Sequence, residues 1–248
     1  MTPPSPEPSP TFPELVEGPL VLLPGSGCTA ALWSRLALPD DVVTPRALEE
    51  PTLDSELDRL LDLLPARFAL AGLSLGAIVA MALVRRAPGR VSRLCLMSTN
   101  PYAPTPAQHE AWAAQREVLR TGSARELQDS LLPVLLSPGR EDLVASTLAM
   151  ADDLGAATYA AQLRLQDSRV DERPGLTQVR CPTLVVAARG DRLCPVSRHE
   201  EVAGLVPGAE LVVLEDCAHL SPLEQPEALS AHLQRWLGGS KTPGSVAG

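Results

Sequence analysis

Short apolar runs alternate along most of the chain with longer segments in which apolar residues recur every three or four positions. Continuous short runs are typical of buried strands, and the longer pattern is typical of helices packed on a sheet. The predicted strands are Leu20–Leu23, Asp41–Thr44, Phe68–Ala71, Val91–Met97, Thr183–Ala188 and Glu210–Leu214. The predicted helices between and after them are Leu53–Leu64, Ala77–Val84, Ser197–Leu205 and Pro226–Leu237. This alternation predicts an α/β fold with a mainly parallel sheet of about six strands, flanked by helices.

The stretch 100–178 interrupts this alternation, because it contains no convincing strand. Its apolar residues recur at helical spacing, as in Leu127, Leu131 and Leu135. The helices expected in it are Pro106–Arg120, Ala124–Leu135, Arg140–Met150 and Gly155–Leu165. A helical insertion between two sheet strands lies over the carboxyl edge of the sheet, where ligands bind. We therefore expect residues 100–178 to form a helical lid.

Four side chains of this stretch are candidates to line a substrate pocket under the lid: Tyr102, Trp112, Leu131 and Leu135. Ordinary packing within the helices is the alternative for the apolar members of this set and for Leu163.

The chain outside the lid divides into a core and two ends. The sheet and its flanking helices are expected to form one core from two segments of the chain, 19–99 and 179–237. Residues 1–18 are rich in proline and predict a disordered or extended arm without the features of a signal peptide, and residues 238–248 predict a flexible tail.

Composition narrows the possible partners and the compartment. The chain has 248 residues, of which 45% are hydrophobic and 21% charged, as in a soluble globular protein. A formal net charge of −9 argues against nucleic acid or an anionic membrane as the main partner. The five cysteines are scattered, odd in number and without C-x-x-C spacing, which indicates neither a zinc site nor a disulfide framework. A reducing cytoplasm fits this pattern best.

A serine lies between two glycines where a predicted strand meets a predicted helix, in Gly72-Leu73-Ser74-Leu75-Gly76. The order fits G-x-S-x-G, in which the chain turns so sharply that the serine hydroxyl is exposed at the apex. A membrane helix is disfavoured, because the surrounding apolar run is shorter than the roughly 20 residues that a bilayer requires. A chance glycine-serine turn is the other alternative. Ser74 is therefore a candidate nucleophile.

A serine nucleophile needs a base, an acid that orients the base, and donors for the oxyanion. Three of the four histidines fall in predicted amphipathic helices, where a surface position is the default: His109, His199 and His232. His219 instead follows the last predicted strand. Asp191 follows the strand before it, and its alternative role is that of an ordinary turn aspartate beside glycine. Both side chains are thus expected at the carboxyl edge of the sheet.

The order Ser74, Asp191, His219, with each residue after a different strand, resembles the alpha/beta-hydrolase family over nearly the whole chain. Four motifs carry the resemblance: P-G-S-G at 24–27, G-L-S-L-G at 72–76, G-D-R-L-C-P at 190–195 and A-H-L-S-P-L-E-Q-P-E at 218–227. The last motif looks like that of the lidded esterases and related lyases. Two features depart from the family. Pro24 stands where the family usually has histidine, and the arm is too short for the family's usual first two strands.

The resemblance implies an alpha/beta-hydrolase fold with Ser74 as nucleophile, His219 as general base and Asp191 as its orienting acid. It also implies an oxyanion hole formed by the backbone N–H groups of Ser26 and Leu75. No cofactor and no metal are expected. The implied activity is that of a serine hydrolase that cleaves a small-molecule carboxylic ester or thioester through an acyl-enzyme. Within the family this includes esterases that cut methyl esters from carrier-protein-bound acids.

Two other functions stay open. A C–C hydrolase, lyase or cyclase of a biosynthetic pathway would keep the same three residues. A non-catalytic small-molecule binding protein would have no need of all three, which counts against it. No obligate protein partner is evident, although an acidic carrier would find basic side chains on the lid: Arg116, Arg120 and Arg125. Charged residues on an exposed helix face are usually only solvated.

Overall fold

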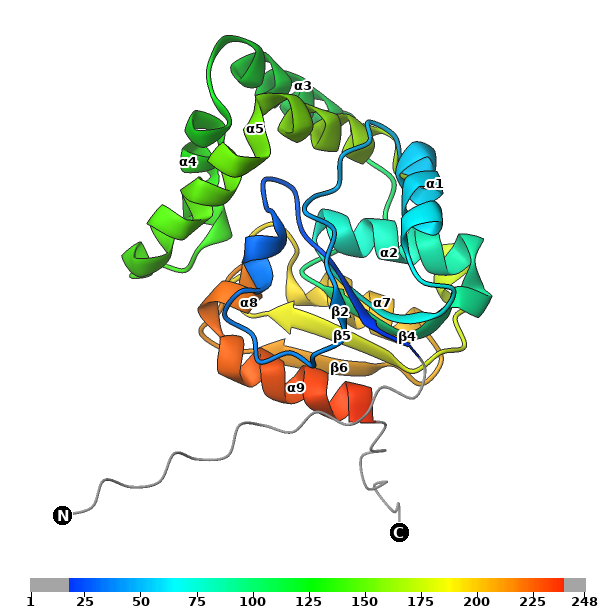
Figure 1. Cartoon of the computed structure of the whole chain (residues 1–248). Helices are drawn as coiled ribbons and strands as arrows, with labels where there is room; N and C mark the ends of the chain where they lie inside the picture. Colours follow the sequence, from blue (N-terminus) through cyan, green and yellow to red (C-terminus); the bar gives the residue numbers. More distant parts are fainter. Residues whose placement is uncertain (1–17, 239–248) are drawn as a thin grey trace, which may run out of the picture.

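A computed structural model describes residues 18–238, so most of the predicted arm and tail lies outside the described residues. Six strands form one sheet in the order β2-β1-β3-β4-β5-β6, and every neighbouring pair is parallel (Figure 1). The strands are β1 (Leu20–Leu23), β2 (Val42–Val43), β3 (Phe68–Leu73), β4 (Val91–Met97), β5 (Thr183–Ala188) and β6 (Glu210–Leu214). The predicted fold class is confirmed, with β2 shorter and β3 longer than expected.

Helices cover both faces of this sheet. One layer contains α1 (Leu53–Leu63), α2 (Leu75–Arg86), α6 (Arg173–Leu176) and α7 (Val196–Leu205). The other contains the 3-10 helix η1 (Ala30–Trp33), α8 (Ser221–Glu224) and α9 (Pro226–Gly238). A second short 3-10 helix, η2 (Pro88–Arg90), leads into β4. Within residues 18–238, no helix is both long enough and apolar enough to cross a membrane.

The apolar pattern explains why the sheet is buried between these layers. Successive residues of a strand point to opposite faces. In β1, Leu20 and Leu22 therefore pack in the core beside α9, whereas Val21 and Leu23 pack in the core beside α1, α2 and α7. Both faces of a parallel sheet are covered, so its strands are apolar without alternation. The continuous runs in the sequence follow from this burial.

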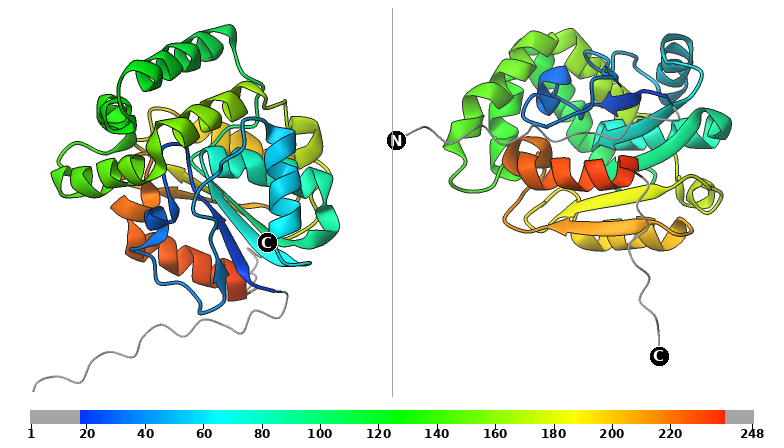
Figure 2. Two further views of the ribbon diagram at one scale, coloured as in Figure 1. Left: turned by 45° about the horizontal axis from the view of Figure 1, so that its top comes forward. Right: turned by 60° about the horizontal axis from the view of Figure 1, so that its bottom comes forward.

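The region between β4 and β5 is helical, as expected. It contains α3 (Pro106–Thr121), α4 (Ala124–Leu135), the 3-10 helix η3 (Glu141–Leu143) and α5 (Val144–Asp167). Capping boxes begin α3 and α4, at Thr105 and Ser123. Gly155 (φ 78°) breaks the helical geometry inside α5, which explains why the sequence predicts two helices there. Figure 2 shows these helices from two further sides, lying beyond one end of the sheet.

Candidate active site

Ser74 occupies the sharp turn between β3 and α2. Its backbone has φ 55° and ψ −114°, a conformation that residues with a side chain rarely adopt. The turn is held on both sides: the Ser74 N–H donates to the Met97 carbonyl (2.9 Å), and the Ser74 carbonyl accepts from Ile78 N–H (3.0 Å). The strained turn presents the side chain to a cavity at the carboxyl edge of the sheet.

Two flanking glycines make this turn possible. A Cβ atom at Gly76 would lie 2.1 Å from the Leu23 carbonyl oxygen, and one at Gly72 would lie 2.4 Å from the Gly76 carbonyl carbon. Both distances are far inside van der Waals contact. Only glycine lets the start of α2 pass β1 and β3 so closely.

His219 lies in the loop between β6 and α8, and it is hydrogen-bonded to Asp191. The His219 Nδ1 atom is 2.8 Å from Asp191 Oδ2, and the two side chains are 3% and 0% exposed. The other carboxylate oxygen, Oδ1, accepts from the backbone N–H groups of Leu193 (2.8 Å) and Cys194 (2.9 Å). Each oxygen of the buried carboxylate is therefore occupied, and its orientation toward the imidazole is fixed.

The charge of Asp191 is stabilised by these partners. Burial opposes ionisation, but His219 and the two backbone N–H groups outweigh it and hold the pKa of the carboxyl below its usual range. A carboxylate that accepts from Nδ1–H leaves Nε2 of the imidazole free to accept a proton. The pair therefore has the orientation of a general base and the acid that positions it.

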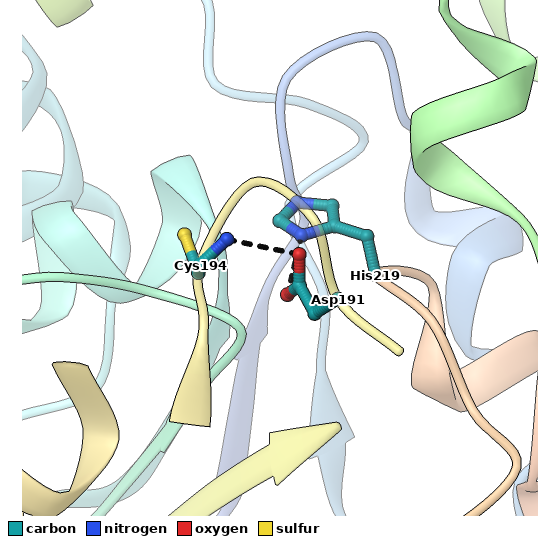
Figure 3. A group of neighbouring side chains, drawn as sticks. All are labelled: Asp191, Cys194 and His219. Carbon is teal, nitrogen blue, oxygen red and sulfur yellow. Dashed lines mark hydrogen bonds and ion pairs between the residues drawn. The ribbon is translucent and has the colours of Figure 1, made fainter. Parts of the chain in front are cut away.

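Cys194 completes a group of three that also has the composition of a metal site. The ligand atoms of Asp191, Cys194 and His219 lie within 4.8 Å of one another (Figure 3). Burial raises the pKa of the Cys194 thiol to about 12, and a metal ligand requires the thiolate. Both Asp191 oxygens already accept hydrogen bonds. The group is accounted for without a metal ion, and the expectation of no metal stays a prediction.

The His219 loop is tied to the sheet and to the helical region. Ser98 Oγ donates to the His219 carbonyl (3.0 Å), and the Ala218 N–H donates to the buried Glu224 carboxylate (3.2 Å). The same carboxylate accepts from the Ser137 N–H (3.3 Å), in the segment between α4 and η3. Glu224 thus joins the histidine loop to the helical region, which gives a structural role to the first glutamate of the motif at 218–227.

The loop after β1 is held by the helical region too. The Gly27 N–H donates to Gln162 Oε1 (2.9 Å), and Gln162 Nε2 donates to the Leu48 carbonyl (2.9 Å). Gly27 has φ 73°, and a Cβ atom there would lie 2.4 Å from Gln128 Oε1. Among the described residues, neither the Ser26 N–H nor the Leu75 N–H has a hydrogen-bond acceptor. Sequence reasoning missed Gln162, which is 135 positions from its partner.

One cavity of about 170 Å³ brings most of the candidates together. Ser26, Ser74 and His219 line it, as do Trp112, Leu131 and Leu135 from the helical region. Ser74 Oγ makes no hydrogen bond to the imidazole, or to any other described residue, in this structure. Such contacts often tighten only when substrate binds.

Tyr102 is the exception among the candidates for the cavity wall. It does not line the cavity, because its hydroxyl donates to the Glu201 carboxylate. Two guanidinium groups lie over its ring, those of Arg173 (4.5 Å) and Arg198 (4.4 Å). Tyr102 was expected to contact the substrate. Its side chain instead joins the loop that contains Pro101 to α7.

His199 also differs from expectation. It is fully buried in α7 rather than on the surface. Its Nε2 accepts from the Thr99 N–H (2.9 Å), and its Nδ1 lies 3.3 Å from the Pro195 carbonyl. An Nε2 that accepts from an N–H group carries no proton. His199 is thus a neutral support for the loop after β4, whose Ser98 and Thr99 line the cavity.

This burial predicts a pH dependence of stability. Burial lowers the pKa of His199 below the unfolded value of about 6.5. Below that pH the unfolded chain binds a proton that the folded protein resists, so the free energy of unfolding falls as the pH drops. The slope from this group is at most about 1.4 kcal/mol per pH unit. In urea unfolding at pH 7.0 and at about pH 5.5, His199→Gln is expected to lose less stability than the parent. Equal losses in both proteins would contradict a neutral, buried His199.

Comparisons with known proteins show what the chain is similar to over most of its length. Residues 20–232 match the model of the alpha/beta hydrolase family. A pimeloyl-[acyl-carrier protein] methyl ester esterase of Aromatoleum aromaticum is 32% identical over 236 residues, 84% of this chain and 93% of that protein. An esterase of the same name from Nitrosomonas europaea is 28% identical over 187 residues, 71% of this chain and 73% of that protein.

Among solved structures, the enol-lactonase from Burkholderia xenovorans LB400 shares the fold, with a TM-score of 0.80 at 24% identity. The match covers 89% of this chain and 92% of that one. The predicted fold and the predicted enzyme class, a hydrolase of the esterase type, are confirmed by these findings. Because the family model spans most of the chain, this protein belongs to the alpha/beta hydrolase family.

Proposed function

We propose that this protein is a serine esterase that hydrolyses a small carboxylic ester through an acyl-enzyme at Ser74. The observation that carries the proposal is one cavity lined by both Ser74, on its strained turn, and His219, hydrogen-bonded to Asp191. Ser74 Oγ attacks the ester carbonyl while His219 Nε2 takes its proton. The imidazolium then gives that proton to the departing alcohol, and water releases the acid in the same way.

The negative charge on the carbonyl oxygen needs donors in the transition state. The backbone N–H groups of Ser26 and Leu75 suit this role, since neither has another acceptor among the described residues. Leu75 begins α2, so its N–H also belongs to the positive end of a helix. Gln162 holds the Ser26 loop in place through Gly27 and is a positioning residue.

The helical region is proposed to act as a lid over this site. Trp112, Leu131 and Leu135 come from it to the cavity wall, and its break at Gly155 provides a point at which α5 can bend. Both relatives are named as esterases for the methyl ester of a carrier-protein-bound acid, so a methyl ester is the first substrate to test. The scattered cysteines favour a cytoplasmic site of action.

A series of esters tests the proposal. The purified full chain is assayed with p-nitrophenyl esters of increasing acyl length and with methyl esters, both as free compounds and bound to an acyl carrier protein. Esters with short acyl chains are expected to be hydrolysed, and the rate is expected to fall as the acyl chain lengthens. The reason is the size of the cavity: its volume of about 170 Å³ is close to the roughly 150 Å³ that holds a benzene molecule.

Labelling by a fluorophosphonate is the control for an intact site. If Ser74 is labelled but no ester is hydrolysed, the esterase proposal fails, and a C–C hydrolase, lyase or cyclase of the same fold takes its place. If Ser74 is neither labelled nor needed for any turnover, a binding protein is the better description.

A further inference from the structure

Arg169 is a buried cation in the wall of the active-site cavity. It follows α5 and is 6% exposed. Its guanidinium lies over the ring of Trp112, 5.2 Å from the centroid, and its Nη2 donates to Gln108 Oε1 (3.2 Å). Its Nε atom is buried and has no hydrogen-bond partner. The ring and the amide therefore fix the guanidinium plane, and Nη1, which makes no hydrogen bond to a described residue, is left as an unoccupied donor.

No carboxylate of the described residues balances this charge. None lies within ion-pair distance of Arg169, and the cavity wall contains no aspartate or glutamate. Burial lowers the pKa of the guanidinium, and Cys194 is the one neighbouring acidic group that opposes the shift. Burial raises the pKa of that thiol to about 12, so it is neutral at pH 7. A buried charge without a counter-ion is costly unless something else pairs with it.

Three other arginines of the lid show a contrast with Arg169. All three were candidates to bind an acidic carrier, and each is instead paired with a carboxylate of this chain. The pairs are Arg116 with Asp167, Arg120 with Glu117 and Arg125 with Asp152. Those side chains are between one-quarter and two-thirds exposed, whereas Arg169 is buried. Of these four arginines, only Arg169 lines the cavity, and only Arg169 has no carboxylate partner among the described residues.

We infer that Arg169 binds a carboxylate at the far end of the acyl group, so that the substrate is the half-ester of a short dicarboxylic acid. A planar guanidinium with unoccupied donors can bind a carboxylate through two parallel hydrogen bonds. The chain itself carries a net charge of −9, so the positive wall of this cavity is a local feature that selects an anion. The inference rests on the proposed esterase for the position of the cleaved bond.

The size of the cavity limits the acid. A half-ester with a few carbons between its two carboxyl groups suits a volume of about 170 Å³, which is close to the roughly 150 Å³ that holds a benzene molecule. An acyl chain whose far end is joined to a carrier would instead put an uncharged thioester beside the guanidinium. The free half-ester and the carrier-bound ester are therefore distinguishable by their dependence on Arg169.

The kinetic test compares two esters of one shape. Monomethyl glutarate carries the carboxylate, and methyl 5-methylhexanoate replaces it with an uncharged isopropyl group. Arg169→Met is expected to lower kcat/KM for the half-ester about 10- to 100-fold, the usual loss of a hydrogen bond to a charged group. The uncharged ester should change less than about threefold. Arg169→Lys keeps the charge and should regain part of the loss.

Arg120→Met is the matched control, because it removes a lid arginine that is already paired with Glu117. It should leave both esters unchanged. Equal losses for the two esters in both Arg169 variants would make Arg169 a structural residue and overturn the inference. An Arg169-independent rate with the half-ester would do the same, as would faster turnover of the carrier-bound methyl ester than of the free half-ester.

A binding measurement keeps this inference separate from the esterase proposal. Calorimetry with glutarate is expected to show binding to the parent and to Ser74→Ala, and at least tenfold weaker binding to Arg169→Met. If glutarate binds through Arg169 but no ester is hydrolysed, the esterase proposal fails and the anion site stands. If esters are hydrolysed but glutarate does not bind, the anion site fails alone. Tighter binding of methyl phosphate than of glutarate would overturn the carboxylate assignment.

Discussion

Ser74→Ala is expected to lower kcat for any ester substrate by on the order of 10⁶, the loss seen when a serine nucleophile is removed from such a site. The hydroxyl forms the covalent bond, and the base at His219 then has no proton to take. Residual catalysis would come from the oxyanion donors and from substrate binding alone. The fold should be preserved, since alanine at this turn keeps the backbone hydrogen bonds of Ser74.

Ser92→Ala is the matched control for this substitution. Ser92 is a buried serine of β4 whose hydroxyl has no hydrogen-bond partner, and it lies away from the active-site cavity. Its loss should leave kcat unchanged. A kcat of Ser74→Ala within tenfold of the parent, measured on protein with native circular dichroism, would remove Ser74 from the role of nucleophile.

Asp191→Asn is expected to lower kcat by on the order of 10⁴, as in triads whose acid is changed to an amide. Oδ1 accepts from two backbone N–H groups, so an asparagine would keep its oxygen there and turn its NH₂ toward His219. The amide would then donate to Nδ1 and force the proton onto Nε2. In that tautomer the imidazole cannot accept the proton of Ser74.

Asp191→Asn should leave the geometry of the site unchanged. A loss of kcat would then result from the wrong tautomer of His219 and not from a change in structure. Asp152→Asn, at an exposed residue paired with Arg125, is the control and should have no effect on kcat. Thermal unfolding should show that both variants are folded. A small loss in Asp191→Asn, comparable with that of the control, would show that the orientation of His219 does not depend on this carboxylate.

Much of the fold was predictable because its physical causes are local. Strands buried on both faces give continuous apolar runs, so all six were found within two residues of their observed bounds, including β2, for which the prediction was one residue too long at each end. Ser74 was predictable for a similar reason. Its turn demands glycine at fixed positions on either side, and a Cβ at Gly76 would collide with Leu23.

The features that the sequence did not predict depend on contacts between residues that are far apart in the sequence. His199 belongs to a helix that looks amphipathic, and it is buried because the Thr99 N–H, 100 positions away, requires an acceptor. Tyr102 was expected at the cavity, but Glu201 and two arginines hold it elsewhere. Nothing in the sequence separates Arg169 from the other lid arginines, because its burial and lack of an acidic partner appear only in three dimensions.

The covalent step is tested most directly by the mass of the protein quenched during turnover of p-nitrophenyl acetate. The expected result is a transient gain of one acetyl group, located by peptide mapping on the segment that contains Ser74 and absent from Ser74→Ala. A gain on another residue, such as Cys194, or steady turnover with no acetylated protein at any time, would contradict an acyl-enzyme at Ser74.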